Sequence, residues 1–299
     1  MKILLLLITT LSLITLTSCE KKIVLNIPDS NPRLVLNALM TEDSLIKVRV
    51  SFSGRPAKDG RFAEPGQARV VLYENNSSKG ELVKTTIKGY TYYVSQQIAK
   101  AGNKYRITVE VPGYKMAEGE DIIPYKSAAQ VSQMQAFTAV AANGAKLLKL
   151  TFRIDNKSLH DTRYQFRLFG LKYNTVRQPD GSIVRQTVRK EIFFSEDAGQ
   201  PILYMDNSIS DFVSDRLIKP EEAATYTFSS EDDLAIKTDT LLLEVSPLTE
   251  SCFKYLYTAI FNAGSIDGFF TEPAPIYTNI SNGLGIVGGM STQIFSLKK

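Results

Sequence analysis

The sequence predicts a mainly β protein, with an N-terminal immunoglobulin-like β-sandwich followed by a second antiparallel β-rich domain that carries one short helix. Three observations predict this class. Many short segments alternate apolar and polar residues, as strands with one buried face do. Turn residues, mostly Gly, separate these segments. One segment, residues 247–264, has apolar residues at the three- and four-residue spacing of a helix.

Residues 33–125 are expected to form the sandwich. Apolar and polar residues alternate strictly over residues 46–53, and residues 105–111 repeat the pattern. About seven short strands within roughly ninety residues are typical of an immunoglobulin-like sandwich. The other strands that we expect in this region are residues 33–40, 67–74, 81–87, 90–95 and 114–123.

Residues 126–299 are expected to form the second β-rich domain. Residues 148–154 and 164–168 alternate as strands do. Residues 178–181, Gln-Pro-Asp-Gly, place Pro and Gly where a type I turn prefers them, which predicts a hairpin. Residues 280–297 are expected to complete the sheet of this domain, and Gly residues there would permit a positive φ or a close approach of the backbone.

The predicted helix has recognisable ends. Ser246 is a good N-cap, Pro247 suits the first helical position, and Gly264 is placed to end the helix. Cys252 lies in the apolar stripe of this helix. Because free Cys is among the most buried residue types, we interpret Cys252 as a small core residue and not as a nucleophile.

Residues 1–18 have the pattern of an export signal, in which Lys2 precedes an apolar run over residues 3–16. Small residues then precede Cys19, as in a bacterial lipobox, where the Cys thiol receives a diacylglycerol and the new amine receives a fatty acid such as palmitate. Several acyl chains make membrane anchoring stable, so residues 19–32 are predicted to be a lipidated tether. The alternative is an ordinary secretory signal in which Cys19 is incidental.

Composition and motifs argue against several classes of function. Removal of the signal leaves a net charge of about +3, which is too small to indicate a nucleic-acid partner. His160 is the only imidazole, so the sequence supports neither a zinc site nor a Ser-His-Asp array. The G-x-G-x-x-G match at residues 283–288 has too few residues after it for a dinucleotide-binding unit. We therefore expect no enzyme activity, no metal and no cofactor.

The predicted hairpin is rich in cations. Arg167, Arg185 and Arg189 are expected on the solvent face of neighbouring strands. One interpretation is a solvated face that neighbouring acidic residues balance, since residues 195–239 are acidic. The other interpretation is a contact for an anionic partner, which makes these three residues candidates for partner binding.

Several segments together resemble one known family. They are the lipobox, residues 33–37 (RLVLN), residues 67–74 (QARVVLYE), residues 102–109 (GNKYRITV) and residues 279–285 (NISNGLG). In these segments the chain is similar to the domain-of-unknown-function 4249 family, which comprises lipoproteins of Bacteroidetes-type bacteria. The sequence departs from the family pattern at Val287-Gly288, where an aromatic residue is expected. The resemblance carries over no catalytic residue and implies companions of TonB-dependent outer-membrane receptors.

We therefore expect a lipid-anchored outer-membrane protein that acts by binding, as an accessory to a TonB-dependent receptor in uptake or surface interaction. Its expected contacts are the membrane, through the N-terminal lipid, and an outer-membrane receptor. Two other classes stay open: an envelope hydrolase whose carboxylates are scattered in the sequence, and a structural or adhesive lipoprotein. The sequence indicates neither the ligand nor the face of the membrane.

Overall fold

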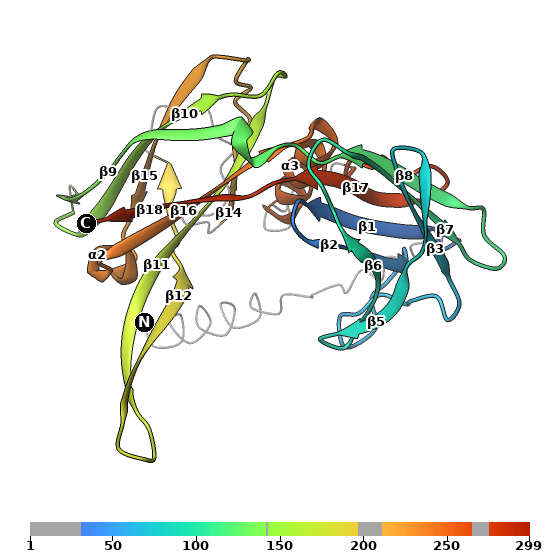
Figure 1. Ribbon diagram of the computed structural model, residues 1–299, viewed down its shortest axis with the longest axis horizontal. Helices are drawn as coiled ribbons and strands as arrows, with labels where there is room; N and C mark the ends of the chain where they lie inside the picture. The colour runs from blue at the N-terminus through green and yellow to red at the C-terminus, as the bar shows by residue number, and fades with distance from the viewer. Residues whose placement is uncertain (1–30, 142, 197–210, 265–274) are drawn as a thin grey trace, which may run out of the picture. The chain divides into compact units, whose positions relative to one another are not determined.

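The computed structural model describes residues 31–141, 143–196, 211–264 and 275–299. In these ranges the chain is mainly β, with several antiparallel sheets and two α-helices, which confirms the predicted fold class (Figure 1). Residues 1–30, and with them the predicted signal and Cys19, lie outside the described residues. Among the helices that are described, none is long and apolar enough to cross a membrane.

The N-terminal sandwich consists of two sheets. One sheet has four strands in the order β4 (Ser77–Glu81), β3 (Arg69–Glu74), β7 (Lys104–Glu110) and β8 (Ala117–Ile122). The other contains, in spatial order, β17 (Leu284–Met290), β1 (Leu34–Thr41), β2 (Leu45–Phe52), β6 (Tyr90–Ile98) and β5 (Val83–Ile87). The expected strands are present, and β4 is the one in this region that we did not predict. All five residues of β4 are exposed, so its sequence has no apolar alternation to reveal a strand.

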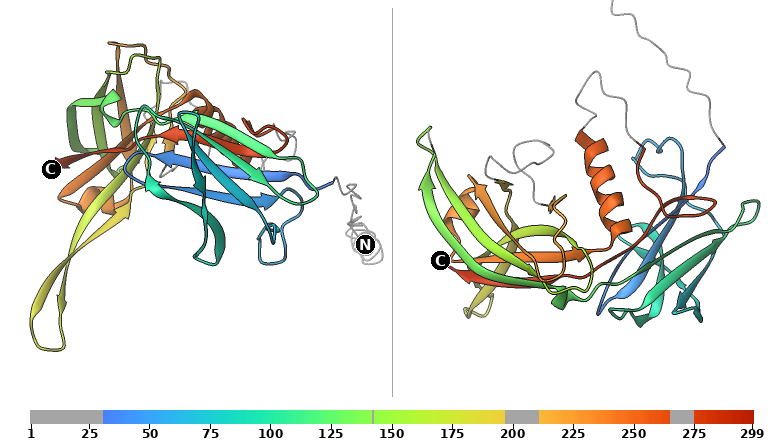
Figure 2. Two further views of the ribbon diagram at one scale, coloured as in Figure 1. Left: turned by 45° about the vertical axis from the view of Figure 1, so that its right-hand side comes forward. Right: turned by 90° about the horizontal axis from the view of Figure 1, so that it is seen from above.

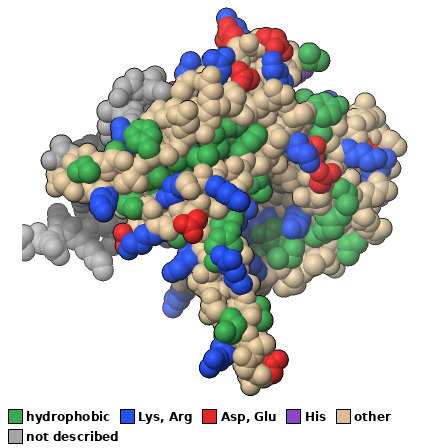
Figure 3. Space-filling model, turned by 60° about the vertical axis from the view of Figure 1, so that its left-hand side comes forward, with side chains coloured by type: hydrophobic (Ala, Val, Ile, Leu, Met, Phe, Trp, Pro, Cys, Tyr) green, Lys and Arg blue, Asp and Glu red, His purple; other side chains and the backbone are tan. Residues whose placement is uncertain are grey.

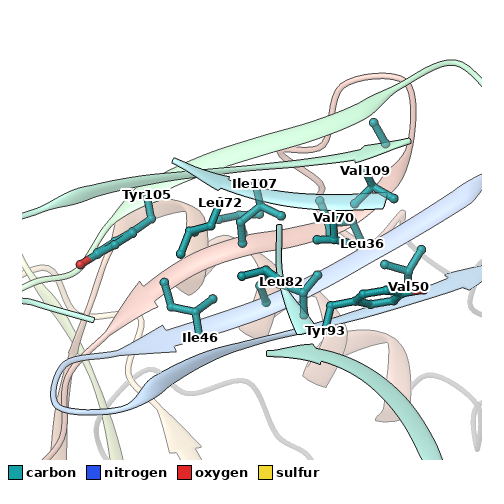
Figure 4. Packing of buried hydrophobic residues seen from close by; sticks show 14 of the residues in the cluster. Leu36, Ile46, Val50, Val70, Leu72, Leu82, Tyr93, Tyr105, Ile107 and Val109 are labelled. Atoms are coloured by element: carbon teal, nitrogen blue, oxygen red, sulfur yellow. The ribbon is translucent and has the colours of Figure 1, made fainter. Parts of the chain in front are cut away.

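The core of the sandwich comes from the alternating residues that the sequence indicated. Leu36, Ile46 and Val50 from one sheet are buried, as are Ile107 and Val109 from the other (Figure 4). Burial of each such side chain stabilises the fold by about 1.5–3 kcal/mol, so the alternation itself selects the face that turns inward.

The second region pairs two further sets of strands. One sheet has the order β13 (Ser195–Glu196), β15 (Ala223–Ser230), β10 (Lys146–Asn156) and β9 (Ala129–Val140), and the 3₁₀ helix Lys126–Ala128 precedes it. The other set comprises β12 (Ile183–Glu191), β11 (Arg163–Arg177), β14 (Asp211–Val213), β16 (Thr240–Leu248) and β18 (Gln293–Lys298). Aromatic rings fill this core; the rings of Phe166 and Tyr226, for example, have centroids 4.7 Å apart.

The expectation that residues 280–297 complete the sheet of the second region is wrong for their first half. Strand β17 pairs in parallel with β1 and so belongs to the N-terminal sandwich, whereas β18 pairs with β16 as expected. Leu248 and Met290 form the pair that joins β16 to β17, and through it one ten-stranded sheet continues between the regions. The domain limits 33–125 and 126–299 stay a prediction.

Glycine allows β17 to lie this close to its neighbours, as the sequence analysis expected. Gly285 has φ +105°, and a Cβ there would lie 2.2 Å from the carbonyl oxygen of Leu36. A Cβ on Gly289 would lie 1.6 Å from the carbonyl oxygen of Ile122. The Asn279 side chain adds a clamp: its Oδ1 accepts from the Val287 N–H at 3.0 Å, and its Nδ2 donates to the Val287 carbonyl at 2.8 Å.

The prediction that the helix starts at Pro247 is wrong. Helix α3 covers Glu250–Gly264, while Ser246 and Pro247 are paired with Gln165 and Tyr164 inside β16. The long run of buried residues in β16 extends the strand past the N-cap signal, and Thr249 caps the helix instead, its Oγ1 accepting from the Cys252 N–H at 3.3 Å. A second helix, α2 (Asp233–Lys237), is capped by Asp232 and was not predicted.

Cys252 is a core residue, as expected. Its side chain is 0% exposed and packs with Leu248 and Phe253. Burial raises the pKa of the Cys252 thiol, so a thiolate is disfavoured. The helix that carries it contacts β17 (Figure 2).

Candidate interaction surface on the β11–β12 hairpin

The predicted turn at residues 178–181 joins two long strands. The Gly181 N–H donates to the Gln178 carbonyl at 2.9 Å, which closes the turn. Strand β11 pairs with β16 only as far as Leu171, whereas its pairing with β12 continues to Arg177. We call residues 172–188 the outer ribbon, because here β11 and β12 pair with each other and with no other described strand (Figure 1).

Two of the three candidate arginines lie at the base of the hairpin and are ion-paired. Arg167 and Arg189 both contact the carboxylate of Glu244, and Arg167 also contacts Glu191. The Arg189 guanidinium lies 3.7 Å from the centroid of the Phe169 ring, which adds a cation–π contact. Strand pairing explains this cluster, because Arg167 lies opposite Glu244 in the β11–β16 register.

Arg185, the third candidate, is separate from this cluster. It lies in the outer ribbon, 4.2 Å from the centroid of the Tyr173 ring, and none of the ion pairs between described residues involves it. The structure therefore brings Arg167 and Arg189 together and leaves Arg185 apart. The balancing acids are Glu191 and Glu244, and neither lies within the acidic segment 195–239 that the sequence indicated. The binding role of the three arginines stays a prediction.

The outer ribbon carries cations that have no acidic partner among the described residues. Lys172, Arg177 and Arg185 take part in none of the ion pairs that these residues form. Asp180 is the single acid of the ribbon, and its carboxylate accepts from the backbone and hydroxyl of Ser182 in the turn. These hydrogen bonds lower the pKa of Asp180. The ribbon therefore has a net charge of +2, from three cations and one carboxylate.

The outer ribbon also exposes apolar side chains. Figure 3 shows hydrophobic side chains on the surface of the projecting hairpin. Ile183 is 65% exposed, Val184 45% and Val176 40%. Val184, Ile192 and Phe194 fall at alternating positions of the chain, yet only Ile192 and Phe194 are buried. Apolar residues recur at alternating positions along β12, including the part in the outer ribbon, where β11 is its only partner among the described strands. Periodicity alone therefore could not show which part of the strand is buried.

Other polar groups of interest have structural roles or lie in solvent. Asp121 accepts from the Gly289 N–H at 3.0 Å and from the hydroxyl of Thr249, and burial raises the pKa of its carboxyl group. His160 lies on an exposed loop. Within the described ranges, no three His, Cys, Asp or Glu residues are grouped closely enough to hold a metal ion.

The fold and this surface define a class: a mainly β protein with an immunoglobulin-like sandwich and a β-ribbon that projects from its second region. The family model described as "Domain of unknown function (DUF4249)" matches residues 20–294, and the chain belongs to this family. No curated protein matches the chain. Among solved structures, the collagen adhesin of S. aureus aligns over 91% of this chain and 97% of its own at 7% identity, with a TM-score of 0.19. We draw nothing from a likeness that small.

Proposed function

We propose that this protein is a lipid-anchored binding protein of the outer membrane that acts as an accessory to a TonB-dependent receptor in uptake or surface interaction. The lipid on Cys19 would hold it at the membrane, with the sequence 19–32 as tether. The outer ribbon would contact the receptor. A structural or adhesive role and an envelope hydrolase are the competing classes.

One observation supports the proposal: the outer ribbon combines cations that have no acidic partner among the described residues with exposed aliphatic side chains. Exposed charges that already have partners contribute little to an encounter, whereas unpaired cations steer an acidic partner toward the ribbon. Ile183 and Val184 would then lose water on contact, which stabilises the complex. Exposed cations alone would keep the ribbon soluble. Exposed aliphatic side chains next to them favour a partner, which would pair with the cations and cover the aliphatic side chains.

The test compares two charge-matched triple variants of the lipidated protein in native outer membranes. The first changes Lys172, Arg177 and Arg185 to Gln in the outer ribbon. The control changes Lys47, Arg55 and Lys58 to Gln, three exposed cations of the N-terminal sandwich. Chemical crosslinking followed by quantitative mass spectrometry measures how much TonB-dependent receptor each protein captures at low and at moderate salt.

The ribbon variant should capture several-fold less receptor than the wild type at low salt, and its capture should depend less on salt, because rim charges act mainly on the association rate. The control should behave as the wild type. Equal capture by all three proteins would leave the ribbon as a solvated surface. Capture of no receptor by the wild type would favour the structural or adhesive class.

A further inference from the structure

Strand β9 forms an edge of its sheet. It has 12 residues and pairs with β10, and with no other described strand. An edge strand presents backbone N–H and C=O groups that can pair with another strand, and natural proteins protect such edges with charged residues, with Pro or by keeping the strand short. The other edge strands in the described ranges have this protection: β4, β5, β8, β12, β14 and β18 each contain a charged residue, and β13 has only 2 residues.

Strand β9 lacks the charges and the Pro. Its sequence, AQVSQMQAFTAV, contains no Asp, Glu, Lys, Arg or Pro. The protective device that it does have is a bulge at Gln133, which has φ +53° and lies where the register with β10 shifts. The regular part of the edge is therefore residues 134–140. Phe137 is 53% exposed and Val140 is 70% exposed, so this part of the strand is open to solvent.

The hairpin turn at the end of β9 shows which backbone groups are free. The Ala141 N–H donates to the Ala145 carbonyl at 2.8 Å, so these two residues form a hydrogen-bonded pair. Hydrogen-bonded and non-hydrogen-bonded pairs alternate along an antiparallel ladder. Phe137 therefore bonds to β10, whereas the N–H and C=O groups of Ala136 and Thr138 point to the free edge.

The core beside this edge is incompletely covered. Met134 and Ala136 of β9 are only partly buried against the aromatic core of the second region, and so are Phe295 and Leu297 of β18. Strand β18 is an edge of the facing set of strands and contacts β9. Both sets therefore end on this side with half-buried apolar side chains, which a further strand would cover.

We propose that a second copy of this chain occupies the edge, with residues 134–140 of the two copies paired antiparallel. A two-fold axis at Phe137 matches these residues one to one and ends the pairing at the two bulges. The side chains that face the core in one copy then continue the same face in the other copy.

The absence of charge on β9 favours a second copy over a charged partner. A charged residue would lie close to its own like charge across a two-fold axis, whereas neutral residues do not repel each other. The nearest cation opposite Phe137 is Lys149 of β10, and the two copies of Lys149 would lie three strand spacings apart, about 14 Å, which exceeds the Debye length of about 10 Å at 0.1 M salt. A charged partner strand would find no counter-charge on β9. This contact does not involve the outer ribbon, so its failure and the failure of the receptor contact are separate results.

Disulfide crosslinking in cells that produce the full chain tests the pairing. Phe137 would lie opposite its own copy at a non-hydrogen-bonded position, where Cβ atoms are about 4.5 Å apart, so Phe137→Cys can form a disulfide there. Gln135→Cys is the control for register, because the two copies of Gln135 would lie about 14 Å apart. Ile98→Cys is the control for random collision, since Ile98 is 57% exposed and lies in β6. The wild type, in which Cys252 is buried, gives the background.

After oxidation, Phe137→Cys should give several-fold more dimer on non-reducing gels than either control. Addition of Thr138→Pro should remove this excess with an unchanged melting temperature, because Pro deletes an N–H that points to the free edge and not one that bonds to β10. The proposal is overturned if Phe137→Cys gives no more dimer than Ile98→Cys, or if Gln135→Cys gives as much. An undiminished dimer band in the folded variant with Thr138→Pro would also overturn it.

Discussion

Replacing Gly289 by Ala should destabilise the protein strongly, because β17 passes against β8 with no room for a side chain. A Cβ at Gly289 would lie 1.6 Å from the carbonyl oxygen of Ile122 and 2.7 Å from its carbonyl carbon. Overpacking in a core costs about 1–3 kcal/mol when side chains can rearrange. Here the obstacle is backbone, which no rotamer change relieves, so we expect a loss of about 3 kcal/mol or more.

Two glycines provide matched controls. Gly144 has φ +83° and open space where a Cβ would lie, so Gly144→Ala carries only the cost of a left-handed backbone, about 1–2 kcal/mol. Gly66 has open space without a positive φ, so Gly66→Ala should be nearly neutral. At about 2–4 °C per kcal/mol, differential scanning calorimetry should show Gly289→Ala melting about 6–12 °C below the wild type. If Gly289→Ala melts together with Gly66→Ala, the close approach of β17 and β8 is refuted.

Three other predictions concern the anchor, the C-terminal strands and an acidic group. Cys19→Ala should move the protein from the membrane to the soluble fraction with an unchanged melting temperature, and unchanged membrane association would exclude the lipid anchor. Truncation after Ile276 removes β17 and β18 and should prevent cooperative unfolding; a truncated chain that melts like the full one would contradict the strand pairing. Hydrogen bonds from Lys79 and Tyr105 lower the pKa of Glu74 from 4.5 to about 2. The ionised Glu74 carboxylate therefore stabilises the folded protein fully above pH 4.5, and this contribution is lost as the pH falls toward 2. The stability difference between wild type and Glu74→Gln, from urea titrations, should shrink over this range, and a constant difference would rule out the shift.

Local patterns in the sequence determined much of the fold. The alternation at residues 46–53 and 105–111 predicted strands with the correct buried face, because a strand places successive side chains on opposite faces whatever lies beyond it. Residues 178–181 predicted the hairpin turn for a similar reason, since turn geometry depends on a few adjacent residues. Cys252 was predicted to be buried from its place in the apolar stripe of the helix and from the usual burial of free Cys, and it is buried.

Only the tertiary structure decided which distant segments pair. Strand β17 joins β1 across about 250 residues of chain, and its sequence contains nothing that distinguishes this partner from one in the second region. For the same reason Ser246 and Pro247 lie in a strand despite a good capping pattern, because pairing with β11 outweighs a local preference. The candidate surface depends on such pairing too: Glu244 neutralises Arg167 and Arg189, and no further described strand pairs with the outer ribbon. Pairing and enclosure are properties of three-dimensional proximity, which local spacing along a chain does not encode.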